Sequence, residues 1–151
     1  MPAQDLVALV DRIVTNKAGR KVDMESCLDL CELVKMRTGN ARPVITSILS
    51  YVNGFDNRRS FFALNLLETL MLNGGFPVRF LVSRKESLNE LARRFPAAPR
   101  KKPDTVEDYI LLLLAKWSRS LGERSARKEE YTNFILISEL LRSKGMLLWV
   151  F

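Results

Sequence analysis

The sequence has 151 residues, a length that suits one compact domain. Hydrophobic residues make up 47% and charged residues 27%, a balance that is typical of a globular protein and excludes a disordered or fibrous chain. The formal net charge of +7 suits an anionic partner such as nucleic acid, anionic lipid or an acidic peptide, and an ordinary solvated surface is the alternative that charge alone leaves open.

Apolar residues recur at helical spacing from the start of the chain. We expect a first helix over 5–15, a second that begins at the N-cap Asp23 and ends near 38–40, and a third over 43–52. The inward stripe predicted for the second helix consists of Met24, Cys27, Leu28, Cys31 and Val34.

The segment 57–73 is the most apolar part of the chain, so we expect it to form a buried central helix that ends at Gly74 and Gly75. A short helical piece over 77–82 follows. We expect Ser83 to cap a sixth helix, and the apolar residues predicted to lie inward on it are Leu88, Leu91, Ala92 and Phe95. The residues of this helix predicted to face outward are Arg84, Lys85, Arg93 and Arg94.

Three prolines between 96 and 103 mark the clearest linker, because proline cannot continue a helix. Asp104 is then predicted to cap a seventh helix, and the last helix carries Phe134 to Leu141 and ends at Gly145. No alternation of useful length indicates a strand. The chain is therefore predicted to be all-α, a bundle or right-handed superhelix of about eight helices.

Residue types argue against catalysis. The chain has no His, which removes the commonest general base and metal ligand, and no nucleophile or phosphate-loop motif is present. We therefore expect no catalytic residue, no metal and no cofactor. The two cysteines, Cys27 and Cys31, are predicted to be core residues. Positive charge is concentrated in one stretch: eight basic and two acidic residues lie between Arg79 and Lys102.

Four motifs make the chain similar to a known family. They are residues 63–69 with Asn73-Gly74-Gly75, residues 83–91, Trp117, and residues 141–145. In this order they resemble the VHS domain, most closely that of the fungal GGA adaptors, over about 5–148. We expect a VHS-like domain over 1–148, with 149–151 as the start of a truncated C-terminal region.

The resemblance implies an eight-helix right-handed superhelix that acts as a non-enzymatic adaptor module. In the GGA group, a groove between the sixth and eighth helices takes acidic dileucine sorting signals of cargo tails. Two positions depart from the animal pattern: Lys85-Glu86 replaces an aromatic-Arg pair, and Asn133 replaces a lysine. The residues that match the groove are Arg84, Lys85, Asn89, Ala92, Phe95, Leu140 and Lys144.

The resemblance also implies weak ubiquitin binding at Met24 and Leu28, where ubiquitin-binding members have an exposed Trp and Leu; core packing is the alternative for both. A second function left open is binding to phosphoinositides or anionic membranes through Lys17, Arg20 and Lys21, as in related ENTH and ANTH domains. We expect no nucleic-acid partner, because the basic run of 93–102 holds the single aromatic residue Phe95 and not the interleaved series that base stacking uses. The expected setting is a cytoplasmic monomer, peripheral at trans-Golgi network and endosome membranes.

Overall fold

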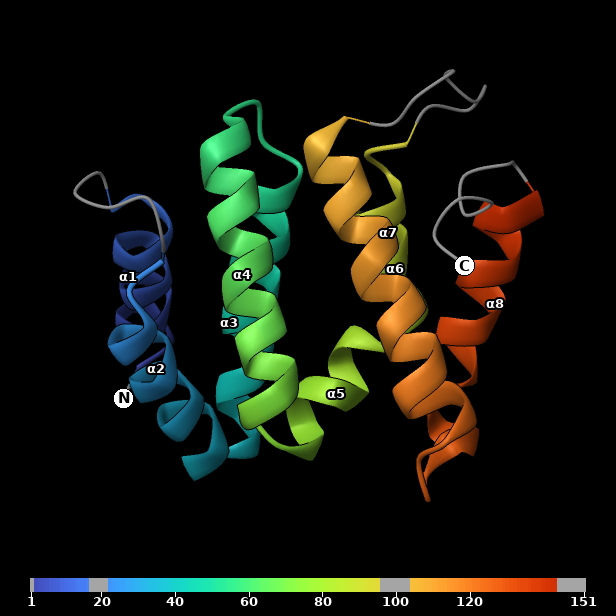
Figure 1. Ribbon diagram of the computed structural model, residues 1–151. Helices are drawn as coiled ribbons and strands as arrows, with labels where there is room; N and C mark the ends of the chain where they lie inside the picture. Colours follow the sequence, from blue (N-terminus) through green and yellow to red (C-terminus); the bar gives the residue numbers. More distant parts are fainter. Residues whose placement is uncertain (1, 17–21, 96–103, 144–151) are drawn as a thin grey trace. The chain divides into compact units, whose positions relative to one another are not determined.

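The computed structural model describes residues 2–16, 22–95 and 104–143. These residues form eight α-helices and no strand, which confirms the predicted all-α class. The chain divides into two compact units, Met1–Val82 and Ser83–Phe151. The helices of each unit are drawn in Figure 1.

The first unit contains five α-helices and one short 3₁₀ turn. The turn, η1 (Thr38–Asn40), joins the second helix to the third. The five helices are α1 (Ala3–Val14), α2 (Met24–Met36), α3 (Ala41–Val52), α4 (Asn57–Asn73) and α5 (Phe76–Val82).

Side-chain caps fix where two of these helices begin. The Asp23 carboxylate accepts a hydrogen bond from the backbone N–H of Ser26, and Asp56 accepts from those of Arg58 and Arg59. Each carboxylate satisfies N–H groups that have no partner inside the helix. Helix α4 has the predicted limits and ends at Gly74, followed by Gly75 with a φ of +88°, which favours glycine.

Helix α4 is the centre of the first unit, as its apolar sequence predicted. It packs against α1, α2, α3 and α5. Leu64, Leu66, Leu67 and Leu70 are fully buried on it, and burial of such side chains contributes about 1.5–3 kcal/mol each. The fold of this unit therefore depends on the packing of the buried leucines of α4 against the surrounding helices.

Both cysteines lie in this core. Cys27 and Cys31 are buried free thiols, as predicted. Burial raises the pKa of the Cys27 thiol to about 12 and that of Cys31 to about 11, because the thiolate loses hydration. Both thiols are therefore protonated at neutral pH and act as small apolar residues.

The second unit contains three α-helices, which lie side by side in Figure 1. A π-helical turn, η2 (Ser118–Glu123), and a 3₁₀ turn, η3 (Lys128–Tyr131), join the second of them to the third. The three helices are α6 (Lys85–Ala92), α7 (Thr105–Trp117) and α8 (Thr132–Ser143).

One predicted cap of this unit is confirmed and one is wrong. Asp104 caps α7, with its carboxylate 2.8 Å from the backbone nitrogen of Glu107. The N-cap of α6 is Arg84, which makes no side-chain cap, and not Ser83. The fully buried Ser83 instead accepts hydrogen bonds from the side chains of its neighbour Arg84 and of Asn133, 50 residues further along the chain.

Helix α8 closes the core of the second unit by packing against α6, α7 and η2. Phe134 is fully buried, with its ring centroid 5.7 Å from that of Trp117 and 6.2 Å from that of Tyr131. Leu88 and Leu91 bury the inner side of α6, as predicted. In the part of the chain that the structure describes, no helix is long and apolar enough to cross a bilayer.

Replacing Gly74 by alanine should destabilise the first unit. The new Cβ would lie 2.7 Å from the carbonyl oxygen of Leu70 and 2.8 Å from Cγ2 of Val78, so backbone must shift. We expect Gly74→Ala to cost about 1–3 kcal/mol, measured as the urea midpoint. Gly39→Ala is the matched control, because no heavy atom lies within 4 Å of its Cβ. Equal midpoints for the two variants would contradict this packing.

Candidate functional site

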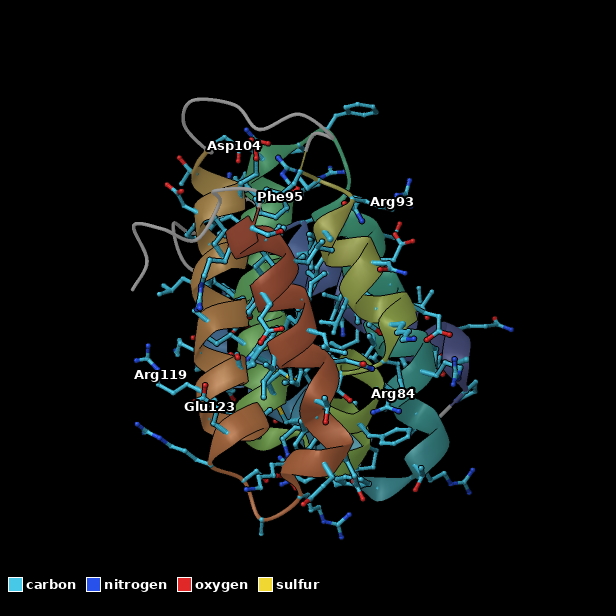
Figure 2. All side chains as sticks on the ribbon, turned by 90° about the vertical axis from the view of Figure 1, so that its right-hand side faces the viewer. Arg84, Arg93, Phe95, Asp104, Arg119 and Glu123 are labelled. Atoms are coloured by element: carbon cyan, nitrogen blue, oxygen red, sulfur yellow. The ribbon has the colours of Figure 1, made fainter. Side chains whose placement is uncertain are left out.

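Helices α6 and α8 pack against each other in the second unit. The start of α6 is joined to the start of α8 by a hydrogen bond of 2.9 Å from Nδ2 of Asn133 to the carbonyl oxygen of Ser83. Figure 2 shows the two helices running side by side from the end marked by Arg84 to the end marked by Phe95. We call the outer surface that they share the α6–α8 face.

Three of the predicted groove residues share one side of α6. Lys85, Asn89 and Ala92 follow the i, i+4, i+7 spacing, next to the buried Leu88. Lys85 and Asn89 are exposed, and Ala92 is half-buried. Phe95 is half-buried just beyond the helix, with its backbone N–H bonded to the carbonyl oxygen of Ala92. The structure therefore brings these four residues together at the surface.

Helix α8 adds apolar residues to this face. Because the Asn133 side chain reaches the start of α6, residues three, four and seven positions further along lie on that same side of α8. Leu136 and Leu140 are 51% and 49% exposed there. Leu140 was predicted, whereas the sequence analysis missed Leu136, whose i,i+4 spacing to Leu140 was the available signal. Lys144 lies outside the described residues.

The positive charge expected along α6 is mostly engaged in contacts within the second unit. Arg84 is half-buried, with Nη2 2.7 Å from the carbonyl oxygen of Glu130 and 3.1 Å from Oγ of Ser83. The Arg94 side chain is only 13% exposed and lies beside Asp104. The prediction that both arginines face outward is therefore wrong: the first is drawn to a carbonyl and the second to a carboxylate.

The remaining charges of α6 nearly balance. Arg93 makes a 2.9 Å ion pair with Glu90, one turn away. Among the described residues of α6, Lys85 is exposed without an ion pair, and the exposed Glu86 follows it directly. The last three basic residues of the stretch, 100–102, lie outside the described residues. The α6–α8 face as described is therefore mainly apolar and amide in character, with one cation.

A second candidate surface lies on α2. The buried side of this helix consists of Cys27, Leu30, Cys31 and Val34. Met24 and Leu28, also on the stripe predicted to be inward, are 52% and 44% exposed. Both residues therefore form an apolar surface one helical turn long, and the core alternative for them is wrong.

The structure leaves the predicted lipid-binding residues untested, because Lys17, Arg20 and Lys21 lie outside the described residues. The residue before them, Asn16, accepts a 3.3 Å hydrogen bond from Nη2 of Arg58. An open cavity of about 190 Å³ at this end of the first unit is lined by one acidic residue, Asp56, and by two basic residues, Arg58 and Arg59. The residues around it are Val14, Thr15, Asn16, Asp56, Arg58 and Arg59.

No group of three or more His, Cys, Asp or Glu side chains suited to a metal ion occurs among residues 2–16, 22–95 and 104–143. The two candidate binding surfaces are the α6–α8 face and the pair Met24 and Leu28 on α2.

Comparison with known proteins agrees with the all-helical fold. The family model of the VHS domain matches residues 1–145. The chain belongs to the VHS family. This VHS domain is an adaptor module of membrane-traffic proteins and not an enzyme.

Its relatives include adaptors of fungi. It is 30% identical over 124 residues to the ADP-ribosylation factor-binding protein GGA1 of Saccharomyces cerevisiae, a match that covers 82% of this chain and 22% of that protein. It is 32% identical over 124 residues to the probable ADP-ribosylation factor-binding protein C25H2.16c of Schizosaccharomyces pombe, covering 82% of this chain and 23% of that protein. The VHS domain thus spans about a fifth of the length of these relatives.

The fold agrees with a solved structure. The VHS and FYVE tandem domains of Hrs, a protein involved in membrane trafficking and signal transduction, align with a TM-score of 0.76 at 18% identity. The alignment covers 93% of this chain and 61% of that chain. The TM-score establishes a shared fold, and at 18% identity the match supports no conclusion beyond the fold.

Proposed function

We propose that this VHS domain binds acidic, leucine-bearing sorting signals on the tails of cargo proteins, at the cytoplasmic surface of the trans-Golgi network and endosomes. One observation carries the proposal. The helices α6 and α8 pack together, and their exposed residues include two leucines, Leu136 and Leu140, a cation, Lys85, and an amide, Asn89. The similarity to the fungal ADP-ribosylation factor-binding proteins supports this setting.

Each part of a short acidic peptide has a matching group on the α6–α8 face. Two exposed leucines of α8 offer apolar area for the leucines of the signal, at about 25 cal/mol for each Å² removed from water. The Asn89 amide carries both a donor and an acceptor for the peptide backbone. Lys85 attracts the acidic residues, and Glu86 beside it limits that attraction.

Ubiquitin is the second candidate ligand, at a different surface. Met24 and Leu28 are exposed at i,i+4 spacing on α2, the positions that the family resemblance assigns to ubiquitin contacts. Methionine is flexible and apolar, so it can pack on an apolar patch, with less area than an aromatic side chain. We expect a dissociation constant of ~100 μM or weaker.

An anionic membrane is the alternative partner, through Lys17, Arg20 and Lys21. Pelleting with liposomes that contain phosphoinositide distinguishes it from the peptide proposal. If the domain sediments with these liposomes and shows no affinity for an acidic dileucine peptide, the membrane function replaces the cargo function.

Charge reversal at Lys85 should weaken peptide binding. We expect Lys85→Glu to raise the dissociation constant for a fluorescein-labelled acidic dileucine peptide about five- to tenfold, because the acidic residues then face two neighbouring carboxylates. Fluorescence anisotropy measures this change, and its size should fall as salt rises. Arg42→Glu, the same charge change at an exposed site in the first unit, is the control. Equal affinities for the two variants would refute the assignment of Lys85.

Substitutions on α2 should affect ubiquitin alone. We expect Met24→Ser with Leu28→Ser to abolish the chemical-shift changes of ¹⁵N-ubiquitin, and Met24→Trp to enlarge them, because contact area falls and rises respectively. The control is Leu136→Ser with Leu140→Ser, which removes similar apolar surface from α8. If that control abolishes ubiquitin binding and the α2 variant retains it, the ubiquitin site is not on α2.

A further inference from the structure

Two long-range hydrogen bonds hold the start of α6 against η3 and the start of α8, and a third joins Arg84 to its neighbour Ser83. Nη2 of Arg84 lies 2.7 Å from the carbonyl oxygen of Glu130 and 3.1 Å from Oγ of Ser83. Nδ2 of Asn133 lies 2.9 Å from the carbonyl oxygen of Ser83. We call this group of four residues, Ser83, Arg84, Glu130 and Asn133, the α6–α8 clasp.

The clasp joins segments that are distant in the sequence. The bond from Arg84 to Glu130 spans 46 residues, and the bond from Asn133 to Ser83 spans 50. The clasp therefore connects the residues before α6 to the turn η3 and to the first turn of α8.

The burial of Ser83 makes its hydrogen bonds with Asn133 and Arg84 costly to lose. Ser83 is fully buried, so its carbonyl and hydroxyl groups have no ready replacement by bulk water. A buried polar group that loses its partner costs more than the net gain from an average hydrogen bond. The position of α6 beside α8 is therefore set by these side chains as well as by apolar packing.

We propose that Arg84 and Asn133 are positioning residues that set the spacing of the α6–α8 face, and that the ligand's charge is read by Lys85 instead. The proposal rests on the peptide-binding function proposed above. It differs from the expectation from sequence, in which Arg84 contacts the ligand and Asn133 is the place of a lost lysine.

The geometry separates the two roles. The Arg84 guanidinium points to a main-chain oxygen of η3, and its side chain is half-buried. Lys85, the next residue, is exposed on the stripe that carries Asn89 and Ala92. Both bonds are donated by one nitrogen, Nη2, at the far end of the arginine side chain, whereas the ammonium of the shorter lysine lies closer to the backbone and would be displaced from both acceptors.

Hydrogen exchange of the ligand-free protein tests the clasp directly. Arg84→Lys keeps the charge and withdraws the donor nitrogen from the Glu130 carbonyl, Asn133→Ala removes the other donor, and Lys85→Gln is the control. We expect peptic fragments that cover 84–91 and 130–137 to exchange about fivefold faster in the first two variants, and at the wild-type rate in Lys85→Gln.

Peptide affinity gives the second measurement, with an acidic dileucine peptide and a version in which Asn and Gln replace its acidic residues. We expect Arg84→Lys and Asn133→Ala to weaken both peptides by the same factor, because they alter spacing and not charge. Lys85→Gln should weaken the acidic peptide alone.

Wild-type exchange rates in both Arg84→Lys and Asn133→Ala would overturn the clasp. A second result would also overturn it: Arg84→Lys exchanges at the wild-type rate but loses affinity for the acidic peptide alone. That result would assign Arg84 to the ligand. If the wild-type protein binds neither peptide, the proposed function fails, whereas the exchange comparison still decides whether the clasp exists.

Discussion

The structure of the second unit depends on how the buried residue Ser83 is satisfied. Its carbonyl and hydroxyl oxygens receive Asn133 and Arg84, which come from opposite sides of the α6–α8 contact. Apolar packing of Leu88 and Leu91 would allow α6 to slide along α8, because dispersion contacts have little directional preference. The directional bonds from Asn133 to Ser83 and from Arg84 to Glu130 fix one register, and the candidate peptide surface is a consequence of that register.

The basic composition overstates the positive charge that the α6 surface presents to a ligand. A chain with a net charge of +7 and a basic stretch after Arg79 suggests a positively charged wall. In the structure, Arg84 and Arg94 are drawn toward oxygen atoms of the second unit, and Arg93 pairs with Glu90. Net charge thus describes long-range attraction, whereas among the described residues of α6 and its caps Lys85 is the exposed cation without an ion pair.

The helices were predictable because their signals are local. Asp23 and Asp104 lie within three residues of the N–H groups that they cap, and the limits of α4 follow from its cap and from Gly74. The role of Arg84 was not predictable. Its partner is the main-chain carbonyl oxygen of Glu130, which is 46 residues away and carries no sequence signal because every residue has such an oxygen.

The burial of α2 shows a different limit of sequence reasoning. Cys27, Leu28 and Cys31 all satisfy a helical spacing. The pattern alone therefore permits the buried side of the helix to include Leu28 or to exclude it. Tertiary packing selects the side that includes Leu30 and Val34, and this choice leaves Met24 and Leu28 exposed. The same sequence pattern can therefore form either core or binding surface.

The most direct test of the account is an amide chemical-shift titration of the ¹⁵N-labelled domain with an unlabelled acidic dileucine peptide. The account predicts saturable shifts at Lys85, Asn89, Leu136 and Leu140, with α2 unaffected. Shifts confined to α2, or none at peptide concentrations well above 1 mM, where binding is worth only ~4 kcal/mol, would contradict it.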